Sequence, residues 1–175
     1  VGTMSSGYNA LLSQANVALE GYSSTGMVSS VGPNRMSYLL NLHGPSEPIE
    51  TACSSSLVAI HKAINVLSNG ECEFAIAGGV NTIISPENHI MFNKAGMFAE
   101  DGRCKTFSAQ ANGYVRGEGV GMLMLKTLSA AERDGDQIYA VLRGSAENHG
   151  GRANSLTAPN PQAQAALLPP RQYAQ

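Results

Sequence analysis

The chain has 175 residues, of which 43% are hydrophobic and 14% charged, and its formal net charge is -2. This composition is typical of a globular domain and excludes a disordered chain. The charge gives no reason to expect nucleic acid or a membrane surface as a partner, and no apolar run is long enough to span a bilayer. Cys53, Cys72 and Cys104 show neither CxxC spacing nor disulfide density, which predicts a reduced, cytoplasmic setting.

The first 32 residues are rich in glycine, serine and asparagine, and they predict one short helix around Leu11 to Leu19. A second helix is predicted over Pro33 to Leu40, with polar and apolar residues on mixed faces. Neither stretch contains a pattern of residues that indicates chemistry by itself.

A turn, a short extended run and a helix are predicted between Gly44 and Asn69. The predicted apolar face of this helix consists of Leu57, Ile60, Ile64 and Leu67. Asn69-Gly70 is a fitting end to the helix. Cys53 therefore lies at or just before the helix N-terminus, where unpaired N–H groups and the helix dipole favour a thiolate.

Most free cysteines are small buried hydrophobes that take part in no chemistry, so position alone does not make Cys53 a nucleophile. Two neighbouring features favour that role. The small hydroxyl residues 54–56 leave room for a ligand and can satisfy backbone donors. Residues 50–52 form a strand-like approach, so we expect the thiol to stand on a sharp strand-to-helix turn.

Beyond the predicted helix, two short apolar runs, Phe74–Val80 and Val120–Leu125, have the pattern of strands covered on both faces in a parallel sheet. A helical segment from Ser129 to Arg133 and a third strand from Ile138 to about Gly144 follow. The alternation predicts a layered α/β fold. The glycines of 117–121 run directly into a strand, which excludes a phosphate-binding loop.

Residues 51–57, TACSSSL, resemble the active-site signature of the β-ketoacyl synthases, specifically the ketosynthase domains of modular polyketide synthases. Other motifs in the family's order are Gly44–Ser46, Ala77–Val80, Asp101–Phe107, Gly117–Gly119, Leu125–Lys126 and Leu156–Asn160. Glu50 departs from the family, which usually has aspartate there. The resemblance predicts a partial ketosynthase domain over residues 1–166, with most of the N-terminal half of a thiolase-like fold and the start of the C-terminal half. Residues 167–175 are predicted to be an atypical tail, truncated or frameshifted.

The resemblance implies that Cys53 is the catalytic nucleophile, and it names no second catalytic residue in this chain. The other residues considered are His43, His61, His89, His149, Lys105 and Lys126. His61 lies about 12 Å along the helix from Cys53, too far to touch the thiol. His149 lies on a glycine-rich loop, but the family's catalytic histidines belong to His-Gly-Thr-Gly-Thr and Asn-Ile-Gly-His motifs, which this sequence does not contain. Lys126 is expected to end its strand in solvent.

The implied activity is transfer of an acyl chain from acyl carrier protein onto Cys53, followed by decarboxylative Claisen condensation with a malonyl-type extender in polyketide or fatty acid biosynthesis. We expect no bound cofactor or metal, because substrates arrive on phosphopantetheine. The expected partners are acyl carrier protein, a second copy in a homodimer and neighbouring synthase domains. The sequences of segments 46–49 and 147–152 favour the ketosynthases of polyketide synthases whose acyltransferase acts in trans. Two alternatives stay open, namely a non-condensing or chain-transfer-only fragment and a thiolase acting on coenzyme A thioesters.

Overall fold

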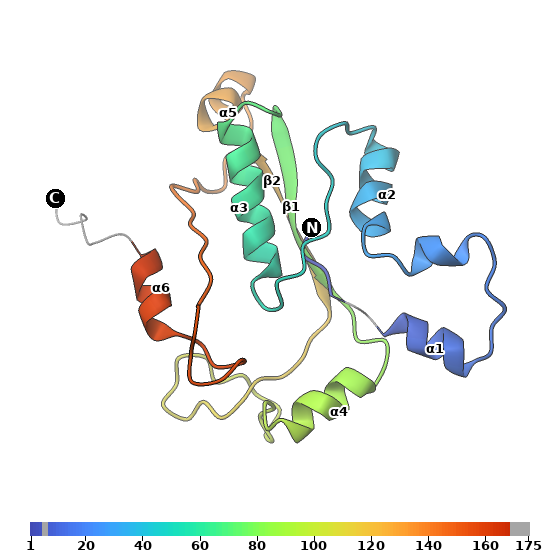
Figure 1. The fold of residues 1–175 in the computed structure, drawn as a ribbon. Coiled ribbons are helices and arrows are strands. Elements are labelled where there is room, and N and C mark those ends of the chain that lie inside the picture. The colour runs from blue at the N-terminus through green and yellow to red at the C-terminus, as the bar shows by residue number, and fades with distance from the viewer. Residues whose placement is uncertain (5–6, 169–175) are drawn as a thin grey trace.

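A computed structural model describes residues 1–4 and 7–168 of the chain (Figure 1). The elements are α1 (Tyr8–Gln14), the 3-10 turn η1 (Ser23–Gly26), α2 (Val31–Leu40), α3 (Ser55–Ser68), β1 (Phe74–Asn81), α4 (Glu87–Lys94), β2 (Gly119–Lys126), α5 (Leu128–Asp134) and α6 (Pro161–Leu167). None of the helices in these residues is long and apolar enough to cross a membrane.

Strands β1 and β2 pair antiparallel, with Gly79 opposite Gly121, and the N-terminal residues join the free edge of β1. Gly2 forms parallel bridges on both of its sides, to Gly79 and to Ile49. Its N–H donates to the carbonyl of Gly78 at 2.7 Å. Residues 1–3 therefore lie between β1 and the segment that leads to Cys53.

The expectation of parallel strands covered on both faces is wrong for β1 and β2, which run antiparallel, and most of β2 is exposed. A continuous apolar run indicates a strand but does not fix its direction. The connection between the strands, residues 82–118, is long enough to return the chain either way. The sequence pattern therefore does not determine whether the two strands run parallel or antiparallel.

The predicted third strand at 138–144 is also not formed, because residues 135–150 contain no regular secondary structure. Figure 1 shows this part of the chain running as an extended trace beside α3. The side chain of Ser145 lies 2.7 Å from Nδ1 of His61 on that helix. An extended run becomes a strand only when a neighbour pairs with its backbone, and no described residue does so here.

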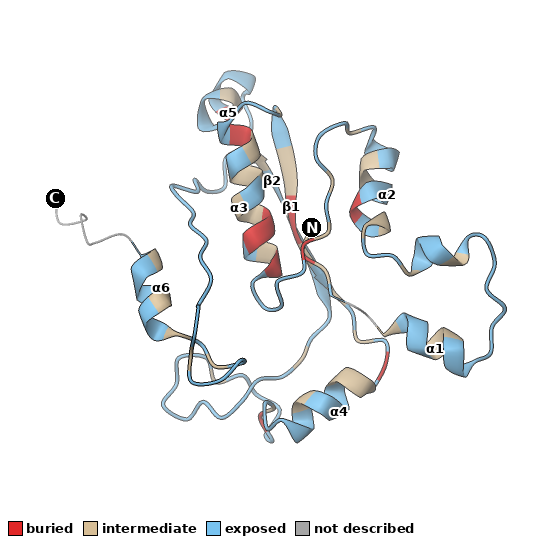
Figure 2. Cartoon of the chain, in the orientation of Figure 1, coloured by how far each residue is buried: buried red, intermediate tan, exposed pale blue. Residues whose placement is uncertain are grey.

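Helix α3 packs on β1 through small side chains (Figure 2). The buried residues of the helix are Ser55, Val58, Ala59 and Leu67. Ala77 of β1 is only 2% exposed. The predicted apolar face of α3 is therefore only partly covered: Leu67 is buried, Ile60 and Ile64 are half-buried, and Leu57 is 69% exposed. Close packing on glycine and alanine favours the small residues of the helix over its large ones.

Helices α2, over Val31–Leu40, and α5, over Leu128–Asp134, lie close to their predicted positions. Helices α4 and α6 were not predicted, and His89, which was expected in a loop, lies in α4. The helix expected around Leu11 to Leu19 begins and ends earlier, as α1. Lys126 is not left to solvent, because its ammonium lies 2.6 Å from carboxylate oxygens of both Asp134 and Asp136. Residues 169–175 of the predicted tail lie outside the described residues.

The glycines in the two strands permit a matched test of this packing. A Cβ at Gly78 would overlap the carbonyl oxygen of Gly121, whereas a Cβ at Gly121 would meet nothing within 4 Å. We expect Gly78→Ala to lower the free energy of unfolding by about 1–3 kcal/mol. Gly121→Ala should leave it unchanged or slightly raise it, because alanine has less backbone entropy to lose. Urea unfolding followed by circular dichroism measures both, and equal effects would contradict the packing.

Candidate nucleophile site

Cys53 stands on a tight turn directly before α3, two residues ahead of the first helical residue, Ser55. Its side chain belongs to an exposed residue and forms no disulfide. Ala52, immediately before it, has a φ of 55°, in the left-handed region that residues with a Cβ rarely adopt. Such strain at a turn holds the next side chain out from the surface, and it is a common property of functional positions.

The hydroxyl of Ser55 holds this turn together. It accepts a hydrogen bond from the backbone N–H of Thr51 at 2.9 Å and donates one to the carbonyl of Ala52 at 2.6 Å. Ser54 adds a bond from its hydroxyl to the carbonyl of Thr51 at 2.8 Å. The sequence indicated small hydroxyl residues here, but it did not show that the buried Ser55 is the one that fixes the turn.

One backbone N–H group at the turn, that of Cys53, is left for a ligand. The N–H of Ser55 bonds to the carbonyl of Ala52 at 3.1 Å. The N–H of Cys53 makes no hydrogen bond within the described residues. A free backbone donor on the nucleophile's own residue, near the positive end of a helix dipole, suits an oxyanion that develops on a bound thioester.

None of the four histidines makes a hydrogen bond to the Cys53 thiol, although all four belong to the described part of the chain. His61 contacts Ser145 and Asn65 through its two ring nitrogens. His149 accepts a bond from the N–H of Gly151 at 2.9 Å. The ring of His89 lies 4.5 Å from that of Phe98. These contacts are structural, and within the described residues no histidine is hydrogen-bonded to the nucleophile as a base.

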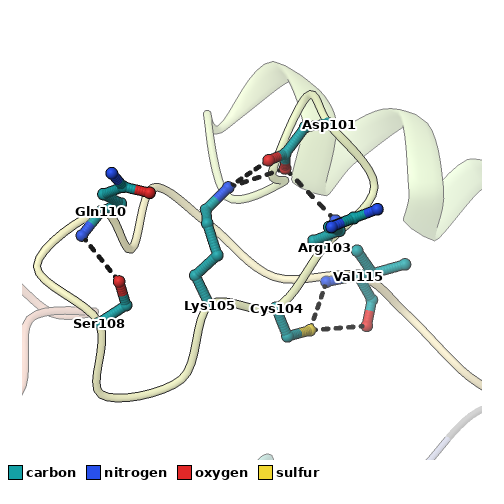
Figure 3. A network of polar contacts seen from close by, with 7 residues as sticks. All are labelled: Asp101, Arg103, Cys104, Lys105, Ser108, Gln110 and Val115. Carbon is teal, nitrogen blue, oxygen red and sulfur yellow. Dashed lines mark hydrogen bonds and ion pairs between the residues drawn. The ribbon is translucent and has the colours of Figure 1, made fainter.

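The motif at 101–107 forms a loop that is held by polar contacts (Figure 3). The ammonium of Lys105 binds both carboxylate oxygens of Asp101, at 2.8 and 2.7 Å. This bond lowers the pKa of Asp101. The sulfur of Cys104 accepts a hydrogen bond from the N–H of Val115 at 3.1 Å and joins the two arms of the loop. Lys105 and Cys104 therefore brace the loop.

Comparison with known proteins identifies the family. Residues 1–131 match the family model described as "Beta-ketoacyl synthase, N-terminal domain". The chain belongs to the β-ketoacyl synthases. It is 62% identical over 168 residues to polyketide synthase PksN of Bacillus subtilis, and the alignment covers 96% of this chain and 3% of that protein. It is 48% identical over 167 residues to a phenolphthiocerol/phthiocerol polyketide synthase of Mycobacterium tuberculosis, covering 95% of this chain and 9% of that protein.

Solved structures confirm the thiolase-like α/β fold and the prediction of a partial ketosynthase domain. A ketosynthase from module 6 of the bacillaene synthase of Bacillus subtilis 168 is 42% identical, with a TM-score of 0.85 over 95% of this chain and 27% of that one. The oxazolomycin ketosynthase domain OzmH KS7 of Streptomyces albus JA3453 is 39% identical, with a TM-score of 0.82. That match covers 95% of this chain and 29% of the ketosynthase. The chain thus spans less than a third of these ketosynthases.

The two exposed cysteines and the partly buried Cys72 should differ in reactivity. Burial, and the neighbouring Glu71, raise the pKa of the Cys72 thiol. A raised pKa leaves less thiolate at neutral pH, so iodoacetamide should modify Cys72 several-fold more slowly than Cys53 at pH 7.5. The difference between the modification rates of Cys53 and Cys72 should narrow as the pH rises through the pKa of Cys72. Peptide mass spectrometry measures the rates, and equal rates at pH 7.5 would contradict the prediction.

Removing the Ser55 hydroxyl should loosen the turn that carries Cys53. We expect Ser55→Ala to cost about 1 kcal/mol in the free energy of unfolding, because two backbone groups lose their partner. It should also change the iodoacetamide rate of Cys53 while that of Cys104 stays constant. Ser56→Ala is the matched control, since the Ser56 hydroxyl makes no hydrogen bond in the described part of the chain. If both variants behave alike, Ser55 does not position the turn.

Proposed function

We propose that, in the intact enzyme, Cys53 receives an acyl chain from acyl carrier protein and that the domain then extends this chain by condensation. One observation carries the proposal: the exposed thiol stands on a strained turn at the start of α3, in a chain of the β-ketoacyl synthase family. A nucleophile so placed is accessible to a bulky thioester and lies beside backbone donors.

The first half of the proposed reaction is thioester exchange. The Cys53 thiolate attacks the carbonyl carbon of the acyl thioester, the backbone N–H of Cys53 stabilises the oxyanion, and the phosphopantetheine thiolate leaves. The products are an acyl group on Cys53 and a free carrier thiol. Phosphopantetheine is thus the arm that delivers the substrate, and it belongs to the carrier protein.

The second half forms a carbon–carbon bond. A malonyl-type extender on a carrier protein loses carbon dioxide, and the resulting carbanion attacks the carbonyl of the Cys53 thioester. Cys53 leaves as thiolate, and the lengthened β-ketoacyl chain remains on the carrier. Stabilising the developing charge in this step is the role of the two histidine motifs of the family, which this sequence does not contain.

Because the reaction divides into thioester exchange and condensation, a second candidate function for the chain by itself is acyl transfer to Cys53 without condensation. The turn, its braces and the free N–H are all within the described residues, whereas no histidine contacts the thiol. A thiolase activity on coenzyme A thioesters is the third candidate, and the polyketide synthase relatives give it no support. The partners that we propose are acyl carrier protein, a second copy in a homodimer with 48–52 near the interface, and neighbouring synthase domains.

We further propose that the parent enzyme is of the kind whose acyltransferase acts in trans, in the cytoplasm. Segments 46–49 and 147–152 support this subclass by their sequence. Lys105 and Lys126 are ion-paired, and we assign neither to catalysis.

Intact-protein mass spectrometry tests the nucleophile directly. The chain is incubated with an acyl-pantetheine thioester loaded on carrier protein, and we expect a mass increase of one acyl group per chain. Cys53→Ala should abolish the increase, whereas Cys104→Ala, which removes the other exposed cysteine, should retain it. Acyl coenzyme A in a parallel reaction separates a thiolase from a ketosynthase. Labelling that persists in Cys53→Ala would overturn the assignment of the nucleophile.

A further inference from the structure

Asparagine or aspartate stands directly before glycine at four places in the chain, at residues 69–70, 101–102, 112–113 and 134–135. Asparagine is a thermolabile residue, and a following glycine makes it more so, because glycine has no side chain to hinder attack by its own backbone nitrogen on the preceding side chain. The attack requires that this nitrogen can move and can lose its proton. The hydrogen bonds of the four glycine N–H groups therefore distinguish the four pairs.

In three of the pairs the folded chain blocks this attack. The glycine N–H donates a hydrogen bond to the carbonyl three residues back, at 3.0 Å for Gly70, 3.1 Å for Gly102 and 3.3 Å for Gly135. The side chains that precede these glycines are held as well, by a hydrogen bond or an ion pair, at Asn69, Asp101 and Asp134. Ring closure at these pairs has to break both kinds of contact first.

The pair Asn112-Gly113 lacks both restraints. The N–H of Gly113 makes no hydrogen bond within the described residues, and neither does the side-chain amide of Asn112. Both residues are exposed, as are Asn69 and Gly70. Exposure therefore does not separate the two Asn-Gly pairs, whereas the free N–H of Gly113 does.

Gly113 also lies where a change in the main chain has consequences. A Cβ on it would lie 2.4 Å from the carbonyl carbon of Phe98, so its backbone packs directly on the other arm of the loop. The next residue, Tyr114, donates to the carbonyl of Met97 at 3.0 Å and accepts from the N–H of Ala99 at 3.1 Å. These bonds fix the register of the two arms.

The following residue extends this alignment into the motif at 101–107. The N–H of Val115 donates to the sulfur of Cys104 at 3.1 Å (Figure 3). Residues 113–115 thus make three successive contacts with the first arm of the loop. A longer main chain just ahead of Gly113 would shift all three contacts out of register.

We propose that Asn112 is a site of spontaneous deamidation and that its isoaspartyl product releases the loop at 101–107 from residues 113–115. The backbone nitrogen of Gly113 attacks Cγ of Asn112, and the bond from Cγ to Nδ2 breaks. The proton of the attacking nitrogen passes through water to Nδ2, which leaves as ammonia. Water then opens the cyclic imide at one of its two carbonyls.

The two possible products should affect the loop differently. Opening at Cγ gives aspartate, which adds a negative charge but leaves the main chain unchanged. Opening at the main-chain carbonyl gives isoaspartate, whose main chain runs through Cβ and Cγ and is longer by one carbon–carbon bond, about 1.5 Å. Only isoaspartate should therefore displace Gly113 from its packing on Phe98.

Ageing the folded chain at mildly alkaline pH tests the site. Peptide mass spectrometry detects the small mass gain when OH replaces NH2, and chromatography separates aspartate from isoaspartate. We expect Asn112 to react several-fold faster than Asn69 in the folded chain, and the two to react at similar rates in urea, where the N–H of Gly70 is released. Circular dichroism verifies the folded sample. Equal rates in the folded chain, or an excess at Asn112 that persists in urea, would overturn the site.

Amide hydrogen exchange tests the effect on the loop. We expect the amides of Tyr114 and Val115 to exchange faster in the aged chain, in proportion to its isoaspartate. Aged Asn112→Gln should keep its protection, because the longer side chain closes the imide ring far more slowly. Freshly prepared Asn112→Asp should keep it as well, since the charge alone does not lengthen the main chain. Amides of β1 that pair with β2 should exchange equally in every sample.

Three results would contradict release of the loop. Unchanged exchange of Tyr114 and Val115 in isoaspartate-containing chain would show that the loop tolerates the longer main chain. Equal loss of protection in fresh Asn112→Asp would assign the effect to charge. Faster exchange in aged Asn112→Gln would assign it to damage elsewhere in the chain.

Discussion

Close backbone approach at Gly2 joins the sheet to the helix that follows the nucleophile. Gly2 is buried and bonds to β1 on one side, and a Cβ there would lie 2.7 Å from the nitrogen of Ser56. A Cβ at Gly79 would likewise lie 3.0 Å from the side chain of Ser56. Only glycine permits contact this close without displacing the helix. The position of the Cys53 turn relative to the sheet therefore depends on glycine, with no side chain, at both position 2 and position 79.

The turn itself is held by local bonds, so its geometry does not depend on a large core. The strained Ala52 is compensated by the two hydrogen bonds of Ser55 and by the packing of Val58 and Ala59 beneath the first turn. A buried hydroxyl that is fully paired rigidifies its surroundings. The result is an exposed thiol on a turn whose backbone is held in place, which suits nucleophilic catalysis.

The sequence predicted what depends on local pattern and missed what depends on distant neighbours. The positions of α2, α3, β1, β2 and α5 follow from periodicity and from turn residues, and so does the thiol ahead of α3. The antiparallel pairing of β1 with β2 does not, because an apolar run carries no direction. Nor does the role of Ser55, since three successive serines look alike until their contacts are known. The strand role of residues 1–3 was equally invisible in so short a stretch.

The partial exposure of the predicted apolar face of α3 has a physical explanation that links several findings. The helix is apolar on more than one side: Val58 and Ala59 form a buried cluster with Ile49, whereas Leu57 is 69% exposed. The contact between His61 and Ser145 brings the extended run at 138–144 beside the same helix, without a pairing partner. A helix that is apolar on more than one side is built to be buried between two layers. The exposed Leu57 and the half-buried Ile60 and Ile64 thus match a second layer, and the predicted periodicity followed them because large residues dominate the pattern.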